Sequence, residues 1–439
     1  MFERTLVALK PSLMLTVFAL SALPGAIMAQ AAPAPVGLEV SGYGFTRFER
    51  YTGYGATAPA VNKDWVRYRF NLGLTTTPIA LKDETSLTFK LTPQMGGFWN
   101  VGGDSTEDPA LGLHEGYMKL KSGKWSLEAG RFEMAYGDEL VIGPVGWNHI
   151  GRAFDGARFH HMLPNDAWID VFATQLDEGT VTGVTGDELA AGDRYFLGVY
   201  AGLGNLIAKG MDLDVYLFDL RYPTYSVTVA DVTATQNGGD ELTLGLRAKG
   251  KVSLLDYRLE AGYQLGSSAV MGVDTTPLGR AGMQADVELG VNIDALKGIR
   301  VGLEGFYASG DNTDTTDVNE AWNPLFPTAH KWLGLMDYVD SKGGRSNIMG
   351  GAFHLKVGIL EPLALVLDAH SFSRPVALPD EGADRPRGGM ELDTGLIYKV
   401  GKQVSFRCAY DIFMKDEADK ASADEAPLRF VELEMLTRF

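Results

Sequence analysis

The sequence predicts an all-β protein, a transmembrane antiparallel β-barrel of about 18 strands. Three observations predict this fold class. Apolar and polar residues alternate over segments of about ten residues, and every second connection between these segments is short. After the N-terminal segment, no stretch approaches the roughly 18 consecutive apolar residues that a membrane-spanning helix needs. If the mature chain enters a membrane, it therefore does so as strands.

The N-terminal segment has the order of a secretory signal. Arg4 and Lys10 precede an apolar run, and the small residues Ala29 and Ala31, the two expected cleavage points, follow it. The other interpretation, an N-terminal membrane anchor, is less favoured because the run is short for a bilayer span. We therefore predict a signal peptide over residues 1–31 and a single outer-membrane barrel domain over residues 32–439.

The alternation predicts each strand in turn. Near the middle of the chain, Leu242, Leu244 and Leu246 alternate with Thr243 and Arg247, so that one face of the strand is apolar and the other is polar. An even number of such strands is typical of an outer-membrane barrel. Along the chain, the predicted strands cover residues 38–51, 64–77, 84–95, 112–121, 124–134, 153–162, 166–176, 193–204, 210–222, 240–251, 254–266, 282–293, 299–309, 347–358, 362–373, 389–399, 402–414 and 428–439.

The connections between these strands alternate between short turns and long polar loops. This alternation places all the short turns at one end of the barrel and all the long loops at the other, as periplasmic turns and extracellular loops are placed. The chain ends in Phe439 on the apolar parity, which resembles the end signal of bacterial outer-membrane barrels, so we expect the outer membrane of a Gram-negative cell. The long loops cover residues 52–63, 96–111, 135–152, 177–192, 223–239, 267–281, 310–346, 374–388 and 415–427.

Large soluble β folds are the main alternatives to a membrane barrel. A sandwich, a solenoid or a propeller also shows alternation, but its apolar face is interior and is not expected to carry aromatic residues near so many strand ends. Here Tyr51, Trp125, Trp168, Tyr222 and Tyr398 all lie near predicted strand ends, where the interfacial girdles of a membrane barrel belong. The barrel is therefore favoured.

The charge and cysteine content exclude several classes of partner and stabilisation. The formal net charge of -17 argues against nucleic acid as a partner and against docking on anionic lipid, because both would repel the chain. The chain has one cysteine, Cys408, and therefore no internal disulfide. Stability must come from packing or from a closed network of hydrogen bonds.

The polar parity of the strands is expected to line the lumen of the barrel. Many charged residues fall on this parity, and a dry core would leave them unsatisfied, so we expect a wet lumen. Basic residues are denser in the early strands and acidic residues in the late strands. Two interpretations remain open, a transverse field that orients a polar or charged polymer, and a set of ion pairs that braces the barrel. The basic candidates from the early strands are Arg67, Arg69, Arg158 and Arg194.

The sequence favours no catalytic or metal site. It contains no Gly-x-Ser-x-Gly motif, and adjacent strand residues such as His160 and His161 point to opposite faces. Asp311, Asp314 and Asp317 lie close together in the longest loop and are weak candidates for Ca²⁺, although their spacing is not that of an EF-hand. A solvated acidic loop is the favoured interpretation. We predict no enzymatic activity and no cofactor.

Two long segments resemble motifs of the alginate export family of outer-membrane barrels. The first is "AGRFEMAYGDELVIGPVGWNHIGRAFDGARF", and the second is "YASGDNTDTTDVNEAWNPLFPTAHKWLGLMDYV". The resemblance implies a monomeric barrel of about 18 strands that secretes a polysaccharide through a charged constriction, with loops that control access. By resemblance, the constriction candidates are Arg131, Asp138, Arg152, Asp155 and Arg158, and the loop or gate candidates are Trp147, Asp311, Phe326 and His330. An alternative role for Arg131 is a structural pair with Asp155.

The function predicted from these observations is that of an outer-membrane channel for polar or charged solutes. Its expected partners are outer-membrane lipid and either a polar solute or an anionic polysaccharide. An alginate-like exporter and a porin for a sugar or an organic acid both remain open, because the acidic late strands would repel a polyuronate. The alternatives from other classes are a barrel enzyme at the cell surface and a plugged structural or adhesion barrel.

Overall fold

A computed structural model describes the chain from Val36 to Phe439 with several internal gaps. The described residues are 36–54, 61–99, 110–177, 180, 181, 189, 190, 193–204, 207, 210–229, 232–272, 277–293, 298–312, 314–339, 344–376, 388–416, 420 and 425–439. The predicted signal peptide, residues 1–31, lies outside them. Residues 37–439 form one compact unit. None of the described helices is long and apolar enough to cross a membrane.

Eighteen long strands build the barrel wall. Each predicted strand is found, with its ends displaced by a few residues at most. The strands are β1 (Leu38–Tyr54), β2 (Val61–Thr76), β4 (Thr85–Phe98), β5 (Ala110–Ser122), β6 (Trp125–Phe132), β7 (Phe154–Met162), β8 (Trp168–Asp177), β11 (Arg194–Gly202), β12 (Met211–Tyr222), β15 (Gly239–Val252), β16 (Leu255–Ser268), β19 (Met283–Ile293), β20 (Ile299–Ala308), β22 (Ile348–Leu360), β23 (Leu363–Ser373), β24 (Gly388–Val400), β25 (Val404–Lys415) and β26 (Leu428–Arg438).

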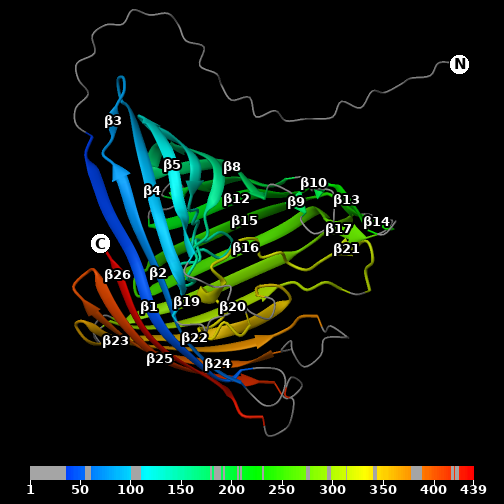
Figure 1. Ribbon diagram of the computed structural model, residues 1–439. Helices are drawn as coiled ribbons and strands as arrows, with labels where there is room; N and C mark the ends of the chain where they lie inside the picture. The colour runs from blue at the N-terminus through cyan, green and yellow to red at the C-terminus, as the bar shows by residue number, and fades with distance from the viewer. Residues whose placement is uncertain are drawn as a thin grey trace, which may run out of the picture. The chain divides into compact units, whose positions relative to one another are not determined.

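The sheet closes between its first and last strands. β1 pairs antiparallel with β2 on one side and with β26 on the other, so the blue and red strands lie side by side in Figure 1. Every other pair of neighbouring wall strands is also antiparallel, for example β15 with β16 and β24 with β25. Closure gives each described wall strand a neighbour on both sides, as a barrel in a lipid environment requires. The predicted fold class is confirmed.

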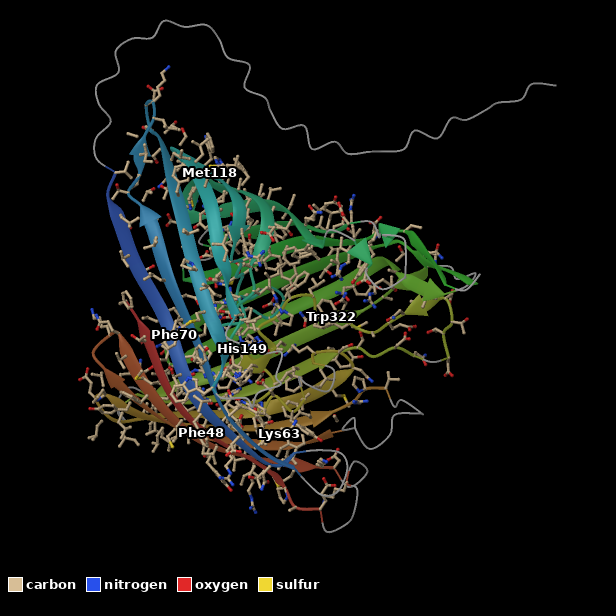
Figure 2. The ribbon with its side chains drawn as sticks, viewed as in Figure 1. Phe48, Lys63, Phe70, Met118, His149 and Trp322 are labelled. Carbon is tan, nitrogen blue, oxygen red and sulfur yellow. The ribbon has the colours of Figure 1, made fainter. Side chains whose placement is uncertain are left out.

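The two faces of the wall separate by parity as predicted. On β26, Leu433 and Met435 are exposed on the outside, whereas Glu432 is buried on the inside. Phe70 and Met118, which are labelled in Figure 2, are likewise exposed outward-facing residues of β2 and β5. Alternation of this kind is what places the charged residues in the lumen.

The long connections contain short strands that the sequence analysis assigned to loops. In the connection between β12 and β15, β13 (Tyr225–Val229) and β14 (Val232–Asn237) form a hairpin that β17 (Val270–Gly272) extends. These segments are rich in Val and Thr, which favour strands, but they are too short to stand out from a polar loop. The other short elements are β3 (Ile79–Ala80), β9 (Thr180–Val181), β10 (Leu189–Ala190), β18 (Leu278–Arg280), β21 (Val318–Asn319), η1 (Pro164–Asp166) and η4 (Ala329–Lys331).

Two of the long connections fold into the lumen and form a hydrophobic core there. We call residues 133–153, between β6 and β7, the first inner loop, and the described part of residues 309–347, between β20 and β22, the second inner loop. Leu140 and Ile142 of the first loop and Trp322 and Leu333 of the second are almost fully buried. His149 and Trp322 can be located in Figure 2. The expected wet lumen is therefore only part of the interior, because loop residues that the strand pattern does not reveal fill the rest of it.

Candidate channel constriction

The two inner loops pair with each other inside the barrel. Ile142 and Phe326 form a parallel β-bridge. The backbone N–H of Gly143 donates to the carbonyl of Phe326 at 2.8 Å, and the N–H of Phe326 donates to the carbonyl of Val141 at 2.9 Å. Phe326, a predicted gate residue, thus lies at the contact between the loops. Hydrogen bonds between the loops satisfy backbone groups that would otherwise be buried without partners.

Glycine permits the close approach of the first inner loop to the wall. A Cβ atom on Gly151 would lie 2.1 Å from Nη2 of Arg69, and Gly137 adopts a φ of +57° beside Arg247. Larger residues would clash at the first position and would be strained at the second. The glycines of this segment, which could be taken from the sequence for a phosphate-binding loop, instead bring the backbone against charged wall residues.

Arg152 joins the two inner loops. Its Nη1 donates to the carbonyl of Gly143 at 3.1 Å in its own loop, and to the carbonyls of Pro327 at 3.0 Å and of Phe326 in the other loop. A guanidinium group suits this role because it presents several donors in a fixed plane. The positive charge of Arg152, which was expected to act on the solute, is therefore directed largely at loop carbonyls.

Trp147 lies between three charged or polar side chains. The guanidinium carbon of Arg47 lies 3.3 Å from the centroid of the indole ring, and the ring of His330 stacks on it at a centroid distance of 3.6 Å. The indole Nε1–H donates to Asp337 at 3.1 Å, and His330 Nδ1 lies 2.5 Å from the other oxygen of that carboxylate. These contacts connect the first inner loop to the second and to β1. Burial lowers the pKa of His330 and outweighs the opposing effect of Asp337.

Asp138 connects the first inner loop to β15. Its carboxylate accepts hydrogen bonds from Arg247 Nε at 2.7 Å and from Lys249 Nζ at 2.6 Å. Burial alone would raise the pKa of Asp138, but the hydrogen bonds and charges of Lys249 and Arg247 outweigh it and hold the pKa below its usual range. Asp138 therefore stays ionised and neutralises two cations of the wall.

The predicted wall arginines of the early strands face the lumen and are paired there. Arg158 donates through Nε to Glu128 at 3.0 Å, and Arg67 Nη2 lies 3.3 Å from Glu49. Arg69 donates through Nη1 to the carbonyl of Val145 in the first inner loop at 3.4 Å. Arg194 lies at the loop end of β11 on the same parity as the buried Phe196, so it belongs to the rim and not to the narrow part.

Two expected constriction residues do not line the lumen. Arg131 and Asp155 are register partners on β6 and β7, on the opposite parity from the buried Phe132 and Phe154. They form an ion pair with each other at 2.5 Å on the outward face. The expectation from the family motif is wrong for these two side chains, because strand parity reverses at every residue. The alternative role for Arg131, a structural pair with Asp155, fits this geometry.

The acidic segment of the second inner loop is held by its own hydrogen bonds. Asp311 Oδ1 accepts from the backbone N–H of Glu320 at 3.0 Å, and Glu320 accepts from the hydroxyl of Thr315 at 2.8 Å. The backbone of Asp317 accepts from Gly279 at 2.8 Å, next to the pairing of β18 with β21. Within the described ranges, no group of three His, Cys, Asp or Glu side chains is arranged to hold a metal ion. Asp314, the remaining Ca²⁺ candidate, donates its backbone N–H to Asn312 at 3.2 Å.

Arg47, Glu49 and Asp337 belong to this site but are not among the residues predicted from the sequence. Arg47 and Glu49 of β1 are fully buried in the lumen and bond to each other at 2.6 Å, while Arg47 also lies 3.1 Å from Glu434 of β26. Arg47 and Glu49 alternate with Phe48 in "FTRFERY". The parity of the first strand could therefore have placed both residues on the lumen face. Asp337 was named only as part of a motif, because its contacts depend on how two distant loops meet.

Three cavities remain around the inner loops. One of about 390 Å³ lies between the loops and is lined by Trp147, Arg152 and His330, and one of about 340 Å³ is lined by Tyr43, Arg69 and Lys90. The third, of about 520 Å³, lies against β15 to β23 and carries the most charge. We call it the charged cavity, and its charged lining residues are Asp138, Lys249, Asp256, Arg258, Glu288, Arg300, Glu304, Lys331, His354, Lys356 and Asp368.

Comparisons with known proteins agree with this architecture. The family model described as alginate export matches residues 104–380, more than half of the chain. Among solved structures, OccK9 (OpdG) of Pseudomonas aeruginosa is similar with a TM-score of 0.60 and 11% identity over 92% of this chain and 98% of that chain. OccAB2 of Acinetobacter baumannii has a TM-score of 0.59 and 12% identity over 91% of this chain and 98% of that chain. At such identities the likeness shows the barrel fold alone.

No curated protein matches the chain. The family match, the closed barrel and the separation of an apolar outer face from a charged lumen nevertheless lead to one conclusion. The chain belongs to the alginate export family and is an outer-membrane channel.

Proposed function

We propose that this channel passes anionic solutes, either carboxylated saccharides or smaller organic acids. The observation that carries the proposal is the arrangement of charge in the charged cavity. The side chains of Lys249 and Lys331 are each 46% exposed, whereas those of Asp138 and Glu288 are only 15% and 17% exposed. A solute in the cavity therefore meets ammonium groups first.

The carboxylates that line the cavity are each 25% exposed or less, and they pair with its basic side chains. Glu288 and Asp256 bind Arg300 at 2.7 and 2.6 Å, and Glu288 also lies 3.3 Å from Arg258. Lys356 lines the same cavity, is exposed, and has no ion-pair partner within the described part of the chain. Because attraction between charges is stronger where water is partly excluded, exposed cations with buried counter-charges favour anions in the cavity.

Two carboxylates of the late strand β24, Glu391 and Asp393, do not oppose this proposal, because the second inner loop covers them. Glu391 and Asp393 of β24 are almost fully buried. The backbone N–H of Met336 donates to Glu391 at 2.9 Å, and the N–H of Leu335 donates to Asp393 at 3.2 Å. Their carboxylates thus face the loop backbone, and a solute in the charged cavity does not meet them.

The inner loops favour a second candidate, a barrel that is plugged and acts through its outer surface. Their buried contact leaves cavities large enough for single sugar units. Passage of a long polysaccharide would require the loops to separate. Conductance distinguishes the two candidates, since a permanently plugged barrel conducts no ions.

The test is ion selectivity in planar bilayers under a salt gradient. We expect stepwise, anion-selective conductance, and we expect the double variant Lys249→Gln/Lys356→Gln to shift the reversal potential towards cations. Arg131→Gln/Arg221→Gln is the matched control, because it also removes two positive charges, both from the outward face of the wall. An unchanged reversal potential in the double variant would contradict the proposal, and folded protein without conductance would favour the plugged barrel.

A further inference from the structure

Charged residues on the outward face of the wall gather at one end of the barrel. Among strand residues with described side chains, every Asp, Glu, Lys or Arg on the outward parity lies next to a long connection and none lies next to a short turn. These outward charges are Arg50, Asp64, Arg131, Asp155, Asp219, Arg221, Asp240 and Arg429. They therefore lie beyond the apolar band, at the level where lipid head groups meet the loop end of the barrel.

Most of the outward charges are neutralised by one another. Arg131 pairs with Asp155 at 2.5 Å. Arg221 Nε lies 2.7 Å from Asp219 and 3.7 Å from Asp240. Exposed pairs of this kind contribute little to stability, but they show that the outward rim can supply its arginines with carboxylates.

Arg50 and Arg429 differ from these pairs. Both side chains are exposed, and within the described part of the chain neither has an ion-pair partner. Arg50 lies opposite Val431 in register, and Arg429 lies opposite Thr52, so the two arginines are diagonal neighbours on adjacent strands. They lie where β1 pairs with β26 and closes the barrel, a place that we call the seam. Diagonal neighbours across a strand pair are close enough for long side chains to meet.

Two guanidinium groups on neighbouring strands repel each other unless an anion lies between them. Asp64 of β2 lies opposite Arg50 in register, but the two side chains form no ion pair within 4.0 Å. Its single negative charge could neutralise only one of the two arginines. The seam therefore carries a local positive charge on a chain whose net charge is -17. An external anion is the group that this arrangement lacks.

We propose that Arg50 and Arg429 bind a phosphate group of an outer-leaflet lipid at the seam between β1 and β26. Arginine presents a planar set of donors that matches a phosphate, and basic clusters at membrane interfaces recognise lipid head groups. The apolar residues Phe48, Val431 and Leu433 lie on the same outward face, one and two steps towards the membrane. They provide the surface on which the acyl chains of that lipid pack. The site is independent of the solute in the lumen.

The test measures lipid retention by the full folded chain in a zwitterionic detergent, using native mass spectrometry with added lipid A. We expect Arg50→Gln/Arg429→Gln to lower the affinity for bisphosphorylated lipid A by about tenfold, since each lost charge-assisted contact to phosphate weakens binding. The matched control, Arg131→Gln/Arg221→Gln, removes two outward arginines that already have carboxylate partners, and its affinity should stay within about twofold of the unaltered chain.

Two further arms identify the source of the phosphate. Dephosphorylated lipid A should bind the unaltered chain about as weakly as phosphorylated lipid A binds the double variant. Inorganic phosphate at the same concentration should not displace the lipid, because it lacks the acyl chains. Equal retention by the double variant and the control, or equal binding of dephosphorylated lipid A, would overturn the proposal. Heat-modifiable gel migration shows that each variant is folded.

Discussion

The first inner loop meets the barrel wall in two different ways. On the side of β8, β11 and β12 its contact is aromatic and buried, and Tyr136 stacks on Tyr200 at a centroid distance of 4.4 Å. On the side of β1 and β2 its contact is polar, through Arg47 and Arg69 to the carbonyls of Trp147 and Val145. Aromatic burial cannot be replaced by water, whereas hydrogen bonds to carbonyls can be. We therefore expect the loop to stay docked on its aromatic side if it separates from the wall on its polar side.

Two tyrosines of the aromatic side are also hydrogen-bonded to carboxylates of the wall. The hydroxyl of Tyr136 donates to Asp170 at 2.9 Å, and that of Tyr200 donates to Asp214 at 2.7 Å. Burial raises the pKa of Tyr136, with a further contribution from Asp170, so its hydroxyl remains a donor. A ring that is both stacked and hydrogen-bonded fixes the loop more firmly than either contact alone.

The largest effect is expected from Tyr136→Ala. Removing the buried ring should destabilise the docked loop by about 3 kcal/mol, in the range of large-to-small aromatic substitutions. Urea titration of the refolded protein and single-channel noise measure the loss. Tyr136→Phe is the control, because it keeps the ring and loses only the hydrogen bond to Asp170, at about 1 kcal/mol. Equal effects of the two variants would show that stacking does not hold this side.

A smaller effect is expected from Trp147→Ala on the polar side. The substitution removes the contacts with Arg47 and His330. It should therefore weaken the docking of the first inner loop by about 2 kcal/mol. Because the aromatic side remains, the protein should stay folded while conductance rises. Single-channel recording checks this, with Trp147→Phe as the variant that retains a ring. Unaltered conductance in Trp147→Ala would contradict the proposed separation of this side.

Arg152→Gln should have a still smaller effect. It weakens the hydrogen bonds to the carbonyls of Phe326 and Pro327 in the second inner loop, at about 1.5 kcal/mol. We expect more frequent brief openings and no change in global unfolding. Lys119→Gln is a matched control, since Lys119 is a lumen cation whose ion pair is with Glu128 of the wall. Equal opening frequencies in the two variants would show that Arg152 does not stabilise the contact between the loops.

The smallest effect is expected from pH. Burial in the docked loops lowers the pKa of His330 from its ordinary value of 6.5, in a site that it shares with Asp337, Arg47 and Arg407. The separated loops therefore bind more protons below about pH 6.5, and acidification favours separation by less than about 1.4 kcal/mol per pH unit. Opening frequency should rise from pH 7 to pH 5. His330→Gln should abolish the rise. An identical rise in that variant would show that a titratable group other than His330 causes the pH dependence.

The sequence predicted the wall much better than the interior. Strand parity is a local property, so residues such as Arg158 and Arg247 could be placed on the lumen face from alternation alone. Arg131 and Asp155 were misplaced because a family motif does not state which way each strand residue points. The contact of Ile142 with Phe326 joins segments almost two hundred residues apart, and no periodicity encodes it.

The hydrophobic core inside the lumen was missed for a related reason. Leu140 and Ile142 belong to a run of only three apolar residues, and Trp322 stands in a polar segment. Neither segment alternates, so no local pattern signals burial. Aromatic residues at strand ends such as Trp168 were assigned to the membrane girdle, but Trp168 lies on the lumen parity and stacks on Tyr200 at 5.5 Å. Only the folded arrangement separates these two roles.

Replacement of the first inner loop tests whether the inner loops narrow the channel. Residues 138–150 would be replaced by a short Gly-Ser linker, and single-channel conductance would be measured in planar bilayers after gel migration has confirmed folding. The account predicts a several-fold rise in conductance and a loss of the dependence on pH, because the contact between the loops is removed. A folded variant with the conductance of the unaltered protein would contradict it.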